Sequence, residues 1–291
     1  MSIIVDPDIP AAKTLLQEGI TVYRPGSVIA DARIAFINLM PVKTDTELDF
    51  MRLLGSSDFN VEIVPVNMAT HISRHTPSEH IDRFYRTFQH ASQQPLHGII
   101  ITGAPLENVA FEDVTYWNEI TSIFDYTQKH NIPALYICWS AFAVLYHRHG
   151  IPMQLTNRKI SGIYTHRILD RCDPLMKNVS DGFHVPHSRY AIWNRTLIES
   201  CPSLHIVADS QGAGIYMAAS DNGNEYFIVG HGEYSTDTLD KEYRRDMAKG
   251  IEPSIPSHYY PDDNPDNKPV NTWHGTAVNI FHNWLHVISR K

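Results

Sequence analysis

Short apolar runs alternate with longer amphipathic segments through the first half of the chain. Apolar runs of about four to eight residues are typical of buried strands. Strands that alternate with helices favour a parallel sheet covered by helices on both faces. We therefore predict an α/β fold with a doubly wound, mostly parallel sheet. The predicted strands are 33–39, 61–66, 97–102 and 133–138, and the predicted helices are 44–54, 79–90, 111–130 and 139–149.

The pattern changes after Gly150. Three apolar segments, 204–209, 214–220 and 225–231, follow one another with turn residues between them. This spacing predicts antiparallel strands that complete the sheet. We also predict helices near 236–249 and 276–288, and a surface loop at 253–269, where Pro, Asp and Asn gather.

The composition restricts the class of protein. Of the 291 residues, 43% are hydrophobic and 19% are charged, which is typical of a globular protein with a sizeable core. The net charge of −8 argues against binding to nucleic acid or an anionic membrane, since both depend on clustered Lys and Arg. We expect one domain over 1–291, with an extension at about 1–30, a core at about 31–249 and a C-terminal loop and helix at about 250–291.

Three features lead us to expect a cytoplasmic protein. The N-terminal residues include acidic groups where a secretory signal needs basic ones. No run approaches the roughly 20 apolar residues that cross a bilayer. The cysteines Cys138, Cys172 and Cys201 are too few, and odd in number, for a disulfide framework.

The seventeen histidines raise the question of a metal site, but their spacing does not favour one. His147 and His149 are two residues apart, so on a helix they face different ways. His71 and His75 are four apart but lack the glutamate of a zincin helix. We therefore expect no metal ion.

Cys138 stands at the junction between the fourth predicted strand and the helix that begins at Trp139. Open α/β sheets bind ligands at the carboxyl ends of their strands, and a helix N-terminus favours a thiolate over a thiol. Cys138 is therefore a candidate nucleophile, and the backbone N–H of Trp139 is a candidate oxyanion donor. From this context alone, a small buried cysteine that ends a strand explains the junction equally well.

A cysteine nucleophile needs a base, and the base needs a group that orients it. His231 ends the segment 225–231, and Glu233 lies two residues further on, on the same side of an extended chain. A carboxylate beside His231 would fix its tautomer and stabilise the imidazolium. Other histidines remain open as the base at this point.

Three groups of motifs follow one another along the chain. The first is Asn-Leu-Met-Pro at 38–41 with Lys43; the second runs from Thr102 to Glu107 and on to Ile-Cys-Trp at 137–139; the third is Gly-His-Gly-Glu-Tyr at 230–234, followed by Glu-Tyr at 242–243 and Arg-Asp at 245–246. Together they resemble the homoserine O-acyltransferases of methionine biosynthesis, over nearly the whole chain. The resemblance implies a class I glutamine-amidotransferase-like core with a flavodoxin-like sheet, and a homodimer.

The resemblance also implies roles for single residues. Cys138 would form the acyl-thioester, His231 would act as the general base, and Glu233 would orient it. Four further residues match positions close to the substrates: Lys43, Lys159, Ser188 and Arg245, the last suited to a carboxylate.

The reaction implied is a ping-pong transfer in which acyl-CoA is a co-substrate and no cofactor stays bound. In the family, glycine after a Gly-Ala-Pro-x turn accompanies succinyl transfer, and glutamate accompanies acetyl transfer. This chain has Glu107 there, whose carboxylate would repel that of a succinyl group. We therefore expect acetyl-CoA as the donor, with succinyl-CoA as the alternative.

The acceptor is less constrained, because some family positions differ. Trp-His-Gly-Thr at 273–276 stands where the family has Trp-Arg-Ser-His. Some relatives acetylate serine for cysteine biosynthesis, so we expect L-homoserine and keep L-serine as an alternative. A Cys–His hydrolase or amidotransferase is a further alternative, but it would not need Arg245 to hold an acceptor carboxylate.

Overall fold

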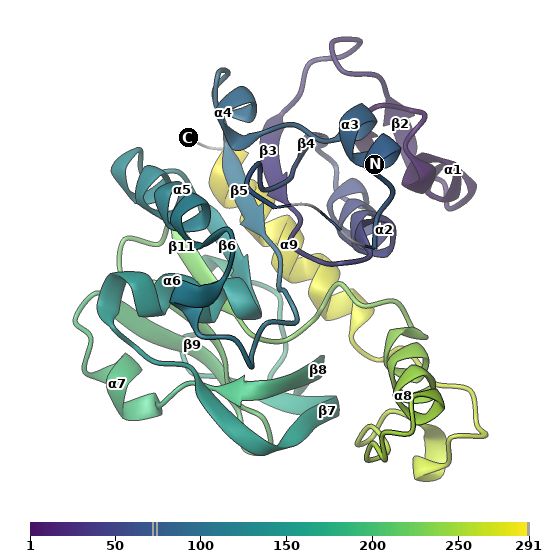
Figure 1. Cartoon of the computed structure of the whole chain (residues 1–291), viewed down its shortest axis with the longest axis vertical. Coiled ribbons are helices and arrows are strands. Elements are labelled where there is room, and N and C mark those ends of the chain that lie inside the picture. The colour runs from purple at the N-terminus through teal and green to yellow at the C-terminus, as the bar shows by residue number, and fades with distance from the viewer. Residues whose placement is uncertain (72, 74, 290–291) are drawn as a thin grey trace.

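The computed structural model describes residues 1–71, 73 and 75–289. In these residues one sheet of eleven strands has the order β2-β1-β4-β3-β5-β6-β11-β10-β9-β7-β8 (Figure 1). The strands are β1 (Ser2–Ile4), β2 (Thr21–Tyr23), β3 (Ala32–Ile37), β4 (Asn60–Val66), β5 (Gly98–Ile101), β6 (Ala134–Ile137), β7 (Gln154–Ile168), β8 (Phe183–Ile192), β9 (Leu204–Ser210), β10 (Gly214–Ser220) and β11 (Glu225–Ile228). The α-helices are α1 (Pro10–Gln17), α2 (Lys43–Gly55), α3 (Ser78–Phe84), α4 (Phe88–Ala91), α5 (Trp117–Lys129), α6 (Trp139–His149), α7 (Arg195–Glu199), α8 (Thr238–Ala248) and α9 (His274–Ser289).

The sheet has a parallel half and an antiparallel half. Every neighbouring pair from β2 to β11 is parallel. The strands β10, β9, β7 and β8 then follow in antiparallel pairs. This arrangement confirms the predicted α/β class and the antiparallel strands of the second half.

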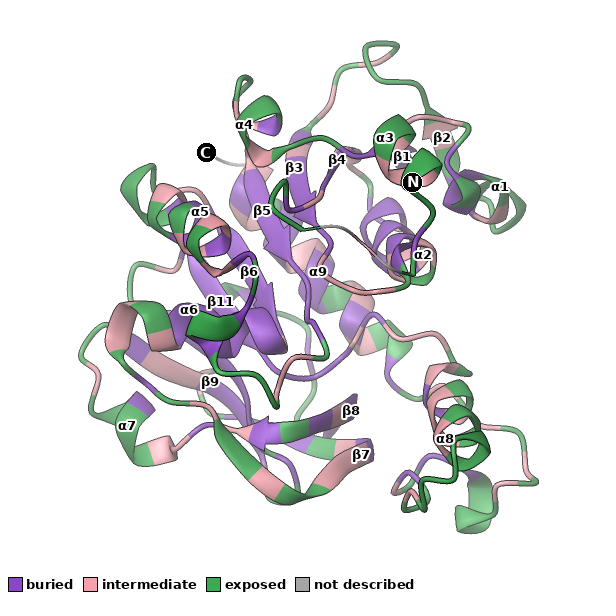
Figure 2. Ribbon diagram, viewed as in Figure 1, coloured by how far each residue is buried: buried purple, intermediate pink, exposed green. Residues whose placement is uncertain are grey.

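Side chains of the central strands alternate between two cores. In β3, Ile34 and Phe36 pack into the core that also holds residues of α1, α2 and α9. Ala35 and Ile37 pack into the core that holds residues of α5 and α6. The alternation follows from the pleat of a strand, and Figure 2 shows the central strands buried, with exposed residues on the outer sides of the helices. The sheet is therefore doubly wound.

Two of the predicted helices are interrupted. The expected helix 79–90 is divided into α3 and α4, because Tyr85 is extended (φ −96°, ψ 155°) and Arg86 forms a bridge with Val66 beside the end of β4. The expected helix 111–130 begins with a 3₁₀ turn at Phe111–Asp113, and α5 starts only at Trp117. In both cases a tertiary contact or a local turn overrides a continuous helical pattern.

Strands missed by the pattern lie at the edges of the sheet. Four of the fifteen residues of β7 are buried, namely Gly162, Ile163, His166 and Ile168, so its sequence shows little apolar alternation. β8 contains Pro186, which the pattern counts against a strand. The segment 1–30, expected as an extension, contributes β1 and β2 to the sheet, and β1 pairs with β4.

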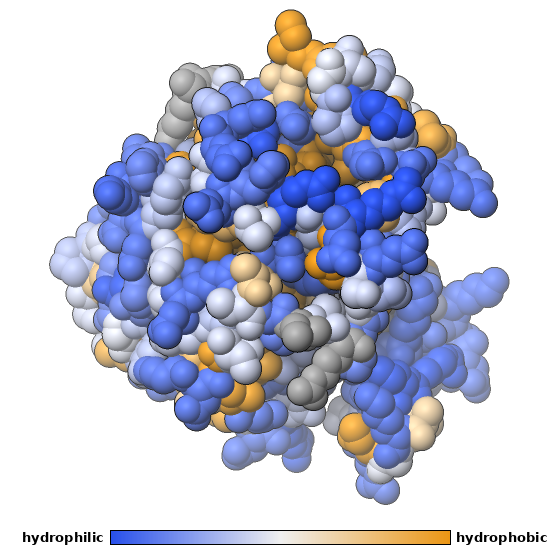
Figure 3. All heavy atoms as spheres, turned by 45° about the horizontal axis from the view of Figure 1, so that its top comes forward, coloured by the Kyte–Doolittle hydropathy of each residue, from blue (hydrophilic) through white to orange (hydrophobic). Residues whose placement is uncertain are grey.

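The surface matches the composition. The face in Figure 3 is largely hydrophilic, with hydrophobic residues in small separate patches. Within the described residues, no helix is both long and apolar enough to cross a membrane.

A substitution at Gly98 of β5 tests how closely α9 packs against the sheet. A Cβ there would lie 2.8 Å from the ring of Trp284 and 3.1 Å from Ile288. We expect Gly98→Ala to destabilise the fold by about 1–3 kcal/mol, since the core has no room for it. Thermal or urea unfolding measures this. Gly275→Ala in the same helix is the control, because nothing lies within 4 Å of its new Cβ; equal losses in both variants would contradict the packing argument.

Candidate active site

Cys138 lies on a sharp elbow between β6 and α6. Its backbone has φ 53° and ψ −115°, a conformation that costs a residue with a side chain of order 1–3 kcal/mol. The thiol is partly exposed. The predicted strand-to-helix elbow at Cys138 is therefore confirmed.

Hydrogen bonds hold the elbow from both sides. The Cys138 N–H donates to the carbonyl of Ile228 at 2.7 Å, and its own carbonyl accepts from Ala141 at 3.0 Å. The buried Ser140 hydroxyl donates to the carbonyl of Ile101 at 2.8 Å. The strain at Cys138 is thus supported by β11, by α6 and by β5.

Small residues next to the elbow leave space for a substrate. A Cβ on Gly103 would lie 3.1 Å from that of Cys138 and 3.6 Å from the nitrogen of Trp139. The first N–H groups of a helix have no acceptor within the helix, so the Trp139 N–H is placed to serve an oxyanion beside Cys138.

His231 follows β11 at the same edge of the sheet. Its Nδ1 lies 2.7 Å from Oε1 of Glu233, and both side chains are buried. The backbone N–H of His231 donates to Pro186 at 2.8 Å. Gly230 must be glycine here, because a Cβ would lie 2.5 Å from Val185. The structure therefore brings together the predicted base and its orienting carboxylate.

The charges around His231 favour the imidazolium. Burial would lower the pKa of His231, but Glu233 and Cys138 outweigh it and raise the pKa to about 10. Its Nε2 is buried and makes no hydrogen bond of standard geometry within the described residues. The ring nitrogen opposite Glu233 is thus left for the thiol and for a reacting hydroxyl. We refer to Cys138, His231 and Glu233 as the Cys–His–Glu group.

A second set of polar side chains adjoins this group. Tyr234 stacks on His231 with ring centroids 4.4 Å apart, and its hydroxyl lies 3.3 Å from Glu242 of α8. Lys159 of β7 lies 3.1 Å from the same carboxylate, and the Ser188 hydroxyl of β8 also donates to it. Lys159 and Ser188 are thus placed together, as expected, around a carboxylate that the motifs alone did not mark as a site residue.

Arg245 lies on the outer side of this set. Its guanidinium is 53% exposed and pairs with Asp246 at 2.8 Å, while Asp246 lies 3.9 Å from Lys159. The Asp246 carboxylate therefore lies between Arg245 and Lys159, and within the described residues Arg245 makes no hydrogen bond or ion pair with the Cys–His–Glu group. Glu242 precedes it by one helical turn, and that spacing is the signal by which sequence reasoning could have found Glu242.

Lys43 and Glu107 occupy different environments. Lys43 is buried, its ammonium donates to the carbonyl of Asn38 and it lies 5.4 Å from the ring of Tyr85. Burial lowers the pKa of Lys43 to about 8, although Glu47 opposes the shift. Glu107 lies half-buried in the loop after β5.

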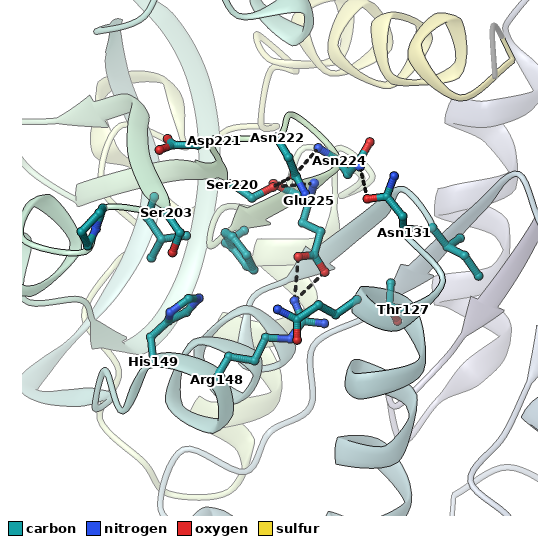
Figure 4. A pocket seen from close by; sticks show the side chains of 15 residues that line it. Thr127, Asn131, Arg148, His149, Ser203, Ser220, Asp221, Asn222, Asn224 and Glu225 are labelled. Carbon is teal, nitrogen blue, oxygen red and sulfur yellow. Dashed lines mark hydrogen bonds and ion pairs between the residues drawn. The ribbon is translucent and has the colours of Figure 1, made fainter.

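Two cavities differ in their relation to the site. One of about 370 Å³ is lined by Arg148, Ser203 and Glu225 among others (Figure 4); Glu225 begins β11, so this cavity lies at the edge opposite Cys138. The other, of about 610 Å³, is lined by Glu233 and Asp49 among others. Only the second adjoins the Cys–His–Glu group.

One set of metal-type ligands lies close together in the described ranges: Asp170, Asp173 and His205. His205 also faces Asp221 at 3.2 Å. His205 is the second residue of β9, and its neighbour Leu204 pairs with Ser220 at the end of β10, so the set lies at the same edge as the 370 Å³ cavity. It contains none of the predicted site residues.

Comparison with known proteins gives a consistent family. The family model for homoserine O-succinyltransferase matches residues 2–291. A protein named homoserine O-acetyltransferase from Lachnospira eligens is 41% identical over 289 residues, covering 98% of this chain and 93% of that protein. Proteins of the same name from Bacteroides thetaiotaomicron and Methanomethylophilus alvi are 43% and 42% identical, covering 96% and 98% of this chain and 93% and 94% of their own.

Solved structures share the fold at low identity. A glutamine amidotransferase from Thermotoga maritima has a TM-score of 0.58 at 12% identity, covering 90% of this chain and 100% of that chain. One from Methylobacillus flagellatus has a TM-score of 0.57 at 10% identity, covering 88% and 94%. These likenesses confirm the class I glutamine-amidotransferase-like fold.

Glu233→Gln tests the electrostatic link between the carboxylate and the thiol. We expect alkylation of Cys138 by iodoacetamide at about pH 7 to slow by about tenfold, because the imidazolium that stabilises the thiolate loses its partner. Peptide mass spectrometry separates Cys138 from Cys172 and Cys201. Glu112→Gln, which changes an exposed carboxylate, is the control; an unchanged rate in Glu233→Gln would contradict the link.

Proposed function

The chain belongs to the homoserine O-succinyltransferase family, and from this premise we propose that it transfers an acetyl group from acetyl-CoA to the hydroxyl of L-homoserine. The protein is an acyltransferase of methionine biosynthesis. The observation that carries the proposal is the Cys–His–Glu group at one edge of the sheet, beside a set of polar side chains suited to an amino acid. The curated relatives named above support acetyl as the acyl group.

In the first half-reaction, the Cys138 thiolate attacks the thioester carbonyl of acetyl-CoA. The N–H of Trp139 stabilises the oxyanion that forms. The carbon–sulfur bond to coenzyme A then breaks, and the departing thiolate takes the proton of the His231 imidazolium. Coenzyme A leaves as the thiol, and Cys138 carries the acetyl group.

In the second half-reaction, neutral His231 accepts the proton of the acceptor hydroxyl through Nε2. The oxygen attacks the acetyl carbonyl on Cys138, and the Cys138 thiolate leaves. Glu233 stabilises the imidazolium in both steps. The new O-acetyl ester leaves as the product, and the thiolate–imidazolium pair is restored without any bound cofactor.

The polar set beside Tyr234 supports an amino-acid acceptor. Arg245 binds the acceptor carboxylate, in exchange for Asp246, as a planar guanidinium does well. Glu242 is the group suited to the ammonium, since it already accepts from Lys159 and Ser188. Lys43, at the start of α2, is the proposed source of a local positive charge for the substrates.

Glu107 is the proposed basis for the choice of donor. Its carboxylate is half-buried after β5, the strand that pairs with β6, and a succinyl group would bring a second carboxylate near it. Like charges in a partly buried site are costly.

We also propose that the protein forms a homodimer and that it acts in the cytoplasm.

Coenzyme A release from acetyl-CoA tests the proposal directly. We expect fast release with L-homoserine, slower release with L-serine, and little without an acceptor. Cys138→Ala should lower the rate by about 10³-fold or more, because the covalent route is lost. If release is faster with L-serine, then L-serine and not L-homoserine is the acceptor. Release of coenzyme A without any acceptor would indicate a hydrolase.

Glu107→Gly tests the donor. We expect the ratio of kcat/KM for succinyl-CoA over acetyl-CoA to rise by about tenfold or more, since one like-charge contact of this kind is worth more than about 1 kcal/mol. Glu112→Gly, at an exposed position in the 3₁₀ turn that follows this loop, is the control. A purified native protein that prefers succinyl-CoA would contradict the role of Glu107.

A further inference from the structure

Behind Glu233 lies the cavity of about 610 Å³, and it is lined by a second carboxylate, Asp49 of α2. The Glu233 carboxylate contacts His231 through Oε1, and Glu233 also lines this cavity. Glu233 and Asp49 thus face the same cavity, and the charge of Glu233 acts on Asp49.

Asp49 is fixed in place by two partners. The Ser235 hydroxyl donates to its Oδ1 at 2.5 Å, and Arg52 donates to the same oxygen at 3.2 Å. Arg52 also donates to the Ser235 hydroxyl at 3.1 Å. These bonds tie α2 to the segment that carries Glu233, two residues before Ser235.

Asp49 is poised to change charge near neutral pH. Burial raises the pKa of Asp49 to about 7; the Ser235 hydrogen bond opposes this, Glu233 adds to it and Arg52 opposes it. The other charged groups around it are Asp45 on α2, Glu18 just after α1, which pairs with Arg52, Lys241 of α8, which pairs with Asp237, and His274 of α9.

We propose that Asp49 is a positioning residue for the Cys–His–Glu group. It holds the segment that carries Glu233 through its hydrogen bond with Ser235, and its own charge acts on Glu233. This deepens the proposed function, and it rests on the roles given there to Cys138, His231 and Glu233. When Asp49 is neutral, Glu233 and the Cys138 thiolate are the negative charges that act on His231. Ionised Asp49 adds a further negative charge, which strengthens the imidazolium and with it the thiolate.

The test is the pH profile of Cys138 alkylation by iodoacetamide in Asp49→Asn, because this readout needs neither substrate. At about pH 5.5 the variant should react as fast as the native protein, since both carry a neutral side chain there. At about pH 8.5 it should react about three- to tenfold more slowly, since only the native protein carries the charge. Asp58→Asn, which changes an exposed carboxylate just after the same helix, should follow the native profile closely.

A purely structural role for Asp49 would shift both ends of the profile equally, and that result, or no change at either end, would overturn the proposal. Ser235→Ala is a second variant in case Asp49→Asn folds poorly. It removes a hydrogen bond that favours ionised Asp49, so the step in the profile should move to higher pH; a step that stays in place would also overturn the proposal. Acetyl transfer measured in parallel keeps this outcome separate from a failure of the proposed function.

Discussion

The parallel pairing of β6 with β11 is the constraint on which the rest of the site depends. The register joins Ile137 to Ile228, and the ladder ends with the hydrogen bond from Cys138 to the Ile228 carbonyl. The segments that follow β6 and β11 therefore leave the sheet at the same edge, and His231 is placed beside Cys138. Because both strands are buried on both faces, a shift in register would disturb both cores at once.

Buried charges extend this local arrangement into the body of the fold. The charged groups form a row that begins at Cys138, His231 and Glu233, where the imidazolium lies between two groups of opposite charge. Asp49 and Arg52 continue this row, and Arg52 in turn makes two hydrogen bonds to Glu18. Asp49 and Glu233 are buried, and in a water-poor region charged neighbours alter one another's proton affinity over longer distances than at the surface. Asp49 and Arg52 of α2 thus join the charged groups that begin at His231 and Glu233.

Helix α8 brings a further carboxylate next to the Cys–His–Glu group, through Tyr234. It carries Glu242, which accepts hydrogen bonds from β7 and β8. The loop that follows α8 returns to β7, where Gly162 bridges Ser257. Gly162 has φ 137°, and a Cβ would lie 2.2 Å from the Ser257 carbonyl, so only glycine permits this approach. The closeness of loop and strand keeps α8 beside the β7–β8 hairpin.

The sequence by itself determined the parallel core and the elbow at Cys138, which depend on local patterns: buried runs, and a strand followed at once by a helix. Local pattern left other histidines open as the base, and the resemblance of the longer motifs to a family singled out His231 with Glu233. The breaks in the expected helices 79–90 and 111–130, the strands β7 and β8, and the places of Glu242 and Asp49 were decided only by the tertiary structure. Asp49 and Ser235 lie far apart in the chain, and no spacing rule joins them. Their meeting follows from how α2 packs beside the loop after β11, and long-range packing of that kind leaves no periodic signal in the residues themselves.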